Sequence, residues 1–143
     1  MKLPVLLALV TALFAADVVI PPAAQMHSAE LAKDLKTPLV LHVGFPVLYK
    51  SVHIQGTAYA GPGSKTEGLE ELKKAVAGQP LDRAIVIYCG CCPWDKCPNV
   101  KPAFAALKAM GFKNVKAVVI PENLKTDWID KGYPTDRRAP TAQ

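Results

Sequence analysis

Two short apolar runs, Ala84–Tyr88 and Val115–Ile120, constrain the fold of this chain more than any other feature of its sequence. Each run has strand length and is nearly continuous in apolar character, which is typical of a strand buried on both faces of a sheet. A segment with helical spacing, Asn99–Met110, separates them. A strand, a helix and a second strand in that order predict two parallel strands joined by a crossover helix. We therefore expect an α/β protein with a mostly parallel sheet covered by helices on both faces.

The rest of the chain continues this alternation. We expect weaker strands at Leu39–Val43 and Thr57–Ala60, and further helices over residues 28–35, 64–76 and 123–131. Ser28 is the expected N-cap of the first helix, and Ser64 with Glu67 fits a capping box at the start of the second. With 143 residues, 50% hydrophobic and 20% charged, the chain is long enough and apolar enough for one folded domain. Its net charge of +5 is spread along the chain, which gives no reason to expect nucleic-acid binding.

The first sixteen residues have the pattern of a secretory signal peptide. Lys2 precedes a short apolar run that ends in small residues, and the run is too short for a comfortable transmembrane helix. We therefore expect residues 1–16 to be a signal peptide, 17–27 a linker, 28–137 the domain and 138–143 a C-terminal tail. The expected location is periplasmic or secreted, with no stable membrane insertion after signal cleavage.

All four cysteines of the chain lie within nine residues, at Cys89, Cys91, Cys92 and Cys97. Cys89 directly follows the expected strand Ala84–Tyr88, and the loop then enters a helix. In parallel sheets, reactive groups lie beyond the carboxyl ends of the strands, and the amides of a helix N-terminus point at anions. A thiolate or a persulfide is such an anion, so we expect a lowered pKa and a nucleophilic sulfur at Cys89.

Several short motifs, in their order along the chain, resemble those of rhodanese-like domains. They are Leu39–Gly44, His53–Thr57, Ile85–Cys89, Gly111–Val115, Trp128 and Gly132–Pro134. The resemblance extends over nearly the whole chain that follows the signal segment. It implies the three-layer rhodanese-like fold and a sulfurtransferase activity.

The same resemblance implies roles for the loop residues. Cys89 would attack a sulfane-sulfur donor, hold the sulfur as a persulfide and pass it to a thiol acceptor, either a small molecule or a partner protein. The other three thiols are a departure from the family pattern, and because they are close to Cys89 in sequence, Cys91, Cys92 or Cys97 could release or receive that sulfur as a disulfide partner. Residues expected to contact the substrate are Gly90, Trp94 and Lys96. No cofactor, metal or nucleic acid is expected to take part.

The chain also departs from the family pattern. His42 and Gly44 stand where the family has the aspartate and the arginine of its Asp-Val-Arg motif. The cysteine loop is longer than the family's and contains no arginine, which argues against a phosphatase-like Cys-x5-Arg anion site. The resemblance gives His53 a structural role. We expect Trp128 to be a packing residue and His42 to make a hydrogen bond in the core.

Three other interpretations of the cysteine loop stay open at this point. Cys89-Gly90-Cys91-Cys92 contains a Cys-x-x-Cys spacing, which allows a reversible redox disulfide. Four soft ligands could instead hold Cu(I), Zn(II) or an iron–sulfur centre, although the Cys-x-Cys-Cys-x4-Cys spacing matches no common pattern. Purely structural disulfides are the third possibility. Four cysteines allow three pairings, of which the one with a vicinal Cys91–Cys92 bridge is the least favoured.

Overall fold

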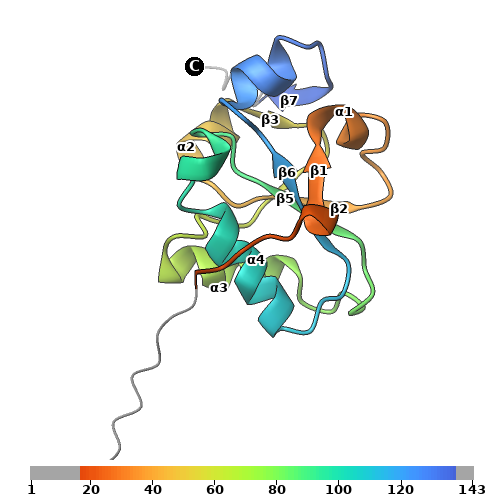
Figure 1. The fold of residues 1–143 in the computed structure, drawn as a ribbon, viewed down its shortest axis with the longest axis vertical. Coiled ribbons are helices and arrows are strands. Elements are labelled where there is room, and N and C mark those ends of the chain that lie inside the picture. The colour runs from red at the N-terminus through yellow and green to blue at the C-terminus, as the bar shows by residue number, and fades with distance from the viewer. Residues whose placement is uncertain (1–16, 138–143) are drawn as a thin grey trace, which may run out of the picture.

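A computed structural model describes residues 17–137, which form a five-stranded parallel sheet at the centre of the molecule (Figure 1). Along the sheet the strand order is β1-β6-β5-β2-β4, and every neighbouring pair is parallel. The strands are β1 (Gln25–His27), β2 (Leu39–His42), β4 (Ala58–Tyr59), β5 (Ile85–Tyr88) and β6 (Val115–Val119). The predicted parallel α/β architecture is confirmed, and β5 occupies the central position.

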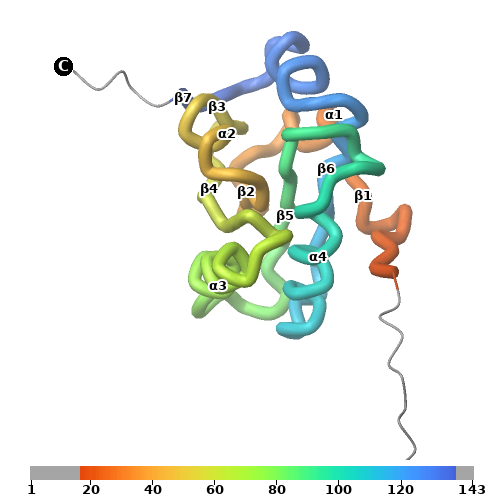
Figure 2. Tube along the Cα trace, turned by 90° about the vertical axis from the view of Figure 1, so that its left-hand side faces the viewer, coloured from red at the N-terminus to blue at the C-terminus, as the bar shows by residue number. Residues whose placement is uncertain are grey.

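Helices cover both faces of this sheet (Figures 1 and 2). The longer helices α3 (Thr66–Ala75) and α4 (Val100–Ala109) pack on one face, and α1 (Ser28–Leu31) and η3 (Lys125–Ile129) pack on the other. Three short elements connect the layers: η1 (Pro22–Ala24), α2 (Pro46–Ser51) and η2 (Trp94–Lys96). The result is the expected three-layer arrangement.

Side chains along β5 alternate between the two faces and divide the core in two. Ile85 and Ile87 join the cluster under α3 and α4, whereas Val86 and Tyr88 join the cluster under α1 and η3. This is the period of two that any strand imposes on its side chains. Cys89 continues the alternation and packs in the α3/α4 cluster, where only 2% of its surface is exposed.

A second, two-stranded sheet fastens the C-terminal segment to the domain. Its strands β3 (Val52–Ile54) and β7 (Thr135–Arg137) pair antiparallel. Trp128 is completely buried beside it, and its indole N–H donates to the Pro134 carbonyl at 2.9 Å. The Trp128 and Tyr133 rings pack edge to face at 5.1 Å, so the prediction of packing roles for this segment is confirmed.

Both predicted helix caps are wrong, and neither helix has a side-chain cap. His27, not Ser28, is the N-cap of α1, and the Ser28 hydroxyl has no partner. Lys65 is the N-cap of α3 without any side-chain hydrogen bond. The backbone amide of Ser64 instead donates to the Asn99 side chain at 3.0 Å, which joins this turn to the start of α4.

Element lengths also differ from expectation. The segment expected to be a helix over residues 123–131 forms the π-helical turn η3, and the short helix α2 was not expected. Residues 17–27, expected as a linker, contain β1, which pairs with β6, and the buried side chain of Ile20. The expected signal peptide 1–16 and tail 138–143 lie outside the described residues. Within residues 17–137, no helix is long and apolar enough to span a membrane.

Candidate functional site

The cysteine loop leaves the carboxyl end of β5, between the ends of β2 and β6. Gly90, directly after Cys89, has a φ of +76°, a left-handed conformation that favours glycine. A Cβ atom at position 90 would also lie 2.9 Å from Cβ of Leu124. The glycine therefore serves two local needs, a sharp change of chain direction and a close approach to the segment before η3.

Gly44, on the loop after β2, allows a second close approach. A Cβ atom at this position would lie 2.8 Å from Sγ of Cys89 and 2.9 Å from Cε1 of His42. The arginine that the family motif places here would therefore collide with the Cys89 sulfur. With glycine at position 44, no side chain occupies the space next to the Cys89 sulfur and the His42 imidazole.

Three of the four cysteine sulfurs converge at one point. The Sγ atoms of Cys89, Cys91 and Cys97 all lie within 4.8 Å of one another, and we call them the three-sulfur cluster. Within it, the Cys89 and Cys91 sulfurs are 3.0 Å apart, and Cys92 lies 3.1 Å from Cys91 at its edge. All four residues are free thiols. The loop therefore brings together every cysteine that the sequence singled out.

The pKa values of two thiols in this cluster, Cys89 and Cys97, shift in opposite directions. Hydrogen bonding to the Cys89 thiol, and then to the backbone amides of Asn99 and Val100, lowers the pKa of Cys97 to about 6, against the opposing effect of burial. The pKa of Cys89 is raised, first by its hydrogen bond to Cys97 and then by burial. The expected fall in the Cys89 pKa is therefore wrong, because the amides at the start of α4 reach Cys97 instead.

Asn99 links the loop to the rest of the domain, and the sequence analysis gave it no role. The residue is completely buried. Its Nδ2 donates to Sγ of Cys89 at 3.4 Å, and its Oδ1 accepts from the Ser64 amide at 3.0 Å. The only signal in the sequence was its position at the start of the expected helix.

A cavity of about 330 Å³ opens beside Cys89 and Cys91, and Gly90 also lines it. The structure therefore places one of the three expected substrate contacts, Gly90, at this cavity. Trp94 packs against the α3/α4 core cluster and Lys96 is exposed, and neither lines the cavity. The other walls come from two segments for which the sequence predicted no role in the site. Their residues include Leu48, Ser51, Val52, Asn123, Leu124 and Lys125.

Both histidines near the site make structural contacts. The buried His42 ring accepts a 3.3 Å hydrogen bond from the Gly44 amide at Nδ1, and its Nε2 has no partner. Burial, and then the charge of His53, lower the pKa of His42 to about 4, so the ring is neutral at physiological pH. His53 contacts the Tyr49 carbonyl through Nδ1 at 2.7 Å and stacks on the Tyr49 ring. These contacts agree with the structural roles expected for both residues.

The three-sulfur cluster also bears on the metal interpretation. Three sulfurs this close can together bind one soft ion such as Cu(I), whereas Cys92 is not part of the group. Among the described residues, no other group of histidine, cysteine or carboxylate side chains has this spacing. Any metal bound by this part of the chain would therefore compete with thiol chemistry at Cys89.

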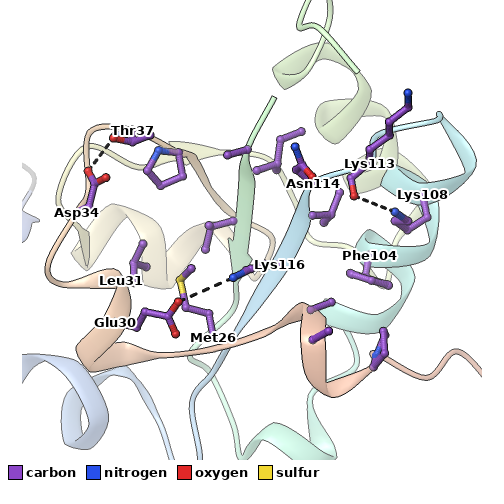
Figure 3. A pocket seen from close by; sticks show the side chains of 18 residues that line it. Met26, Glu30, Leu31, Asp34, Thr37, Phe104, Lys108, Lys113, Asn114 and Lys116 are labelled. Atoms are coloured by element: carbon purple, nitrogen blue, oxygen red, sulfur yellow. Dashed lines mark hydrogen bonds and ion pairs between the residues drawn. The ribbon is translucent and has the colours of Figure 1, made fainter. Parts of the chain in front are cut away.

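A larger cavity of about 710 Å³ lies at the opposite end of the sheet (Figure 3). Apolar side chains such as Met26, Leu31 and Phe104 line it, with Lys108, Lys113 and Lys116 among the charged groups. It contains no cysteine or histidine. Size alone does not make it the reactive site, because the nucleophilic side chains gather at the carboxyl end of β5.

Comparison with known proteins supports the fold. No family model and no curated protein matches the sequence. A rhodanese-like domain from Anabaena sp. is 20% identical, with a TM-score of 0.59, covering 84% of this chain and 86% of its own. A rhodanese-related protein from Thermoplasma volcanium is also 20% identical, with a TM-score of 0.53, covering 78% of this chain and 96% of its own. A Helicobacter pylori protein is 12% identical, with a TM-score of 0.58, covering 85% of this chain and 96% of its own.

These similarities define the class of structure: the chain has the fold of rhodanese-like domains. In this chain, that fold carries a cysteine cluster at the carboxyl end of its central strand. The combination is a rhodanese-like fold with a cysteine-rich loop at the end of its central strand.

Proposed function

We propose that this protein binds and transfers sulfane sulfur as a persulfide on Cys89. The observation that carries the proposal is the position of the Cys89 sulfur, which lines a cavity at the end of the central strand and lies against two further cysteine sulfurs. Solved structures of the same fold described as rhodanese-like support the same assignment.

The pair of Cys89 and Cys97, whose sulfurs lie within 4.8 Å of each other, supplies the base for the first step. Cys97 is the ionised member of the pair at neutral pH and can accept the Cys89 proton. The resulting Cys89 thiolate attacks the outer sulfur of a donor such as thiosulfate in the cavity. A bond forms between Sγ and that sulfur, the sulfur–sulfur bond of thiosulfate breaks, and sulfite leaves with the electron pair.

The product persulfide has a nearby hydrogen-bond donor. Nδ2 of Asn99 already donates to Sγ of Cys89, and it holds the sulfur at the cavity wall. Thiols, free or on a partner protein, are the proposed acceptors. We also propose that the protein works outside the cytoplasm, after removal of residues 1–16, and this part of the proposal rests on the sequence pattern alone.

Sulfur uptake by reduced protein tests the proposal. After a brief anaerobic exposure to thiosulfate, we expect wild type to have gained about one sulfur atom per chain, detected by intact mass spectrometry. Cys89→Ser should gain none. Cys92→Ser is the matched control, because Cys92 lies outside the three-sulfur cluster, and it should load like wild type. Normal loading of Cys89→Ser would overturn the proposal.

A soft-metal module is the second candidate, and the convergence of three sulfurs favours it. Such a module would yield near-stoichiometric metal by elemental analysis after anaerobic purification, and its cysteines would resist alkylation until a chelator is added. Protein that contains no metal and is alkylated freely, but takes up sulfur, would exclude this candidate.

A further inference from the structure

We propose that Cys97 discharges the Cys89 persulfide within the same chain, releasing hydrosulfide and leaving a Cys89–Cys97 disulfide. This inference rests on the proposed function, since it needs the persulfide on Cys89. It adds the identity of the resolving residue, the product, and the class of reductant that the protein then requires.

Proximity favours an internal reaction. The Cys97 sulfur lies within 4.8 Å of the Cys89 sulfur. Both residues are held in place, Cys89 at the end of β5 and Cys97 just before α4. A nucleophile and an electrophile fixed this close react far faster than the same groups free in solution.

The surroundings of the two candidate nucleophiles favour Cys97 over Cys91. Cys97 lies just before α4, and the backbone amides of Asn99 and Val100 at the start of that helix lower its pKa and so favour a thiolate. Among the described residues, the hydrogen bonds of the Cys91 sulfur are to two other sulfurs, those of Cys89 and Cys92. Cys97 is therefore both close to the Cys89 sulfur and in a position that favours the thiolate form.

The reaction balances as a thiol–disulfide exchange. Cys97, which accepted the Cys89 proton in the first step, passes that proton to the outer sulfur of the persulfide. The resulting Cys97 thiolate attacks the inner sulfur, which is Sγ of Cys89, and forms a bond to it. The bond from Sγ to the outer sulfur breaks, and the outer sulfur leaves with the electron pair as hydrosulfide. The sulfane sulfur is thereby reduced by two electrons, and the two cysteine thiols are oxidised to a disulfide.

A second turnover then requires a reductant. A dithiol supplies the two electrons and two protons through a mixed disulfide, and it becomes a disulfide itself. Cys97 is only partly buried, so the bridge can be reached from solvent. The inferred partner is therefore a dithiol, and dithiothreitol is the probe that represents it.

The sequence offers a direct assay of this bridge. Trypsin cleaves after Lys96, so it separates Cys97 from the peptide 84–96 that holds the other three cysteines. Thiosulfate-loaded wild type, kept without added thiol and then alkylated, should release about one hydrosulfide per chain. Its digest should contain the peptide 84–96 linked to the Cys97 peptide, and dithiothreitol should separate them.

Two variants complete the experiment. Cys97→Ser should hold the persulfide on Cys89 and release hydrosulfide at least ~10-fold more slowly. Cys92→Ser, the matched control, lies outside the three-sulfur cluster, retains Cys97 and should discharge like wild type. Unchanged release from Cys97→Ser, or a wild-type bridge confined to peptide 84–96, would overturn the inference. The wild-type digest decides the question even if Cys97→Ser takes up sulfur slowly. Absence of extra sulfur on Cys89 in every protein would instead overturn the proposed function.

Discussion

At the scale of single residues, the site depends on which of two thiols, Cys89 or Cys97, is ionised at neutral pH. Burial and neighbouring groups determine this by shifting the two pKa values. Cys89 is buried and its pKa is raised, whereas the interactions with Cys89 and with the amides at the start of α4 lower the pKa of Cys97. Charge therefore rests on Cys97 at neutral pH, beside the sulfur that faces the cavity. In the proposed mechanism, a Cys89 thiolate forms when the proton moves to Cys97, and the pair acts as nucleophile and base.

This division predicts the pH dependence of alkylation. The lowered pKa of Cys97, about 6, means that its thiolate persists at neutral pH and is lost as the pH falls below 6. We expect the rate of Cys97 carbamidomethylation to be half-maximal near this pH, measured by peptide mass spectrometry. Cys89→Ala removes the hydrogen-bond donor and should move the midpoint upward. A midpoint in the ordinary thiol range for wild type would contradict this assignment of charge.

Gly44 provides a second test at this scale. In Gly44→Ala the new Cβ would lie 2.8 Å from the Cys89 sulfur, so the sulfur must shift. We expect reduced sulfur loading and a loss of about 1–3 kcal/mol in the free energy of unfolding, as for other overpacked core positions. Gly56→Ala is the control. Its φ of +75° costs about 1 kcal/mol, but its Cβ would meet nothing within 4 Å, so loading should not change.

The sequence was sufficient to locate the cysteine cluster, but not to predict which thiol is ionised. That property depends on where the α4 amides point and on how deeply Cys89 is buried, and neither follows from spacing alone. The same limit applies to the cavity, whose walls at Ser51 and Leu124 come from segments far from the cysteines in sequence.

At the scale of elements, the turn before α4 is the structure that organises the loop. Asn99 joins this turn to Ser64 and to the Cys89 sulfur through its buried side chain. Apolar runs were enough to predict β5, β6 and α4, because burial on both faces leaves a continuous apolar signal. Helix caps were not predictable, since the Ser64 amide bonds to Asn99, a residue 35 positions away.

Replacing Asn99 tests this organisation. Asn99→Ala leaves the Ser64 amide without its partner, so we expect the free energy of unfolding in denaturant to fall by about 1–3 kcal/mol. The midpoint of persulfide loading against thiosulfate concentration should also rise. Asn114→Ala removes an exposed amide that donates to the Asp82 carbonyl, and it is the matched control. An equal loss of stability in both variants, with normal loading, would contradict the linking role of Asn99.

At the scale of the whole molecule, two apolar clusters hold the sheet, and the cysteine loop lies at one end of it. The main buried residues of these clusters come from strands and helices, and of the four cysteines only Cys89 is fully buried. The order of motifs along the chain allowed the fold to be predicted, because each motif corresponds to a sheet strand, a turn or the closing Trp128 segment. The reactive end of the sheet follows from that topology.

This architecture predicts that the extra cysteines contribute little to stability. Replacing Cys91, Cys92 and Cys97 together by serine should leave the melting temperature within about 5 °C of wild type in a thermal scan. A disulfide across so short a loop would constrain the unfolded chain only weakly. The triple variant should turn over slowly. A large fall in melting temperature with unchanged turnover would show that these cysteines are structural.

The position of the transferred sulfur is the most direct test of the proposed chemistry. Reduced wild type is treated briefly with thiosulfate, alkylated, digested with trypsin and fragmented in the mass spectrometer. Within peptide 84–96, fragment ions distinguish Cys89 from Cys91 and Cys92. We expect the extra sulfur on Cys89 at the earliest time point. First appearance of the sulfur on Cys91, Cys92 or Cys97, with Cys89 unmodified, would contradict sulfur transfer through Cys89.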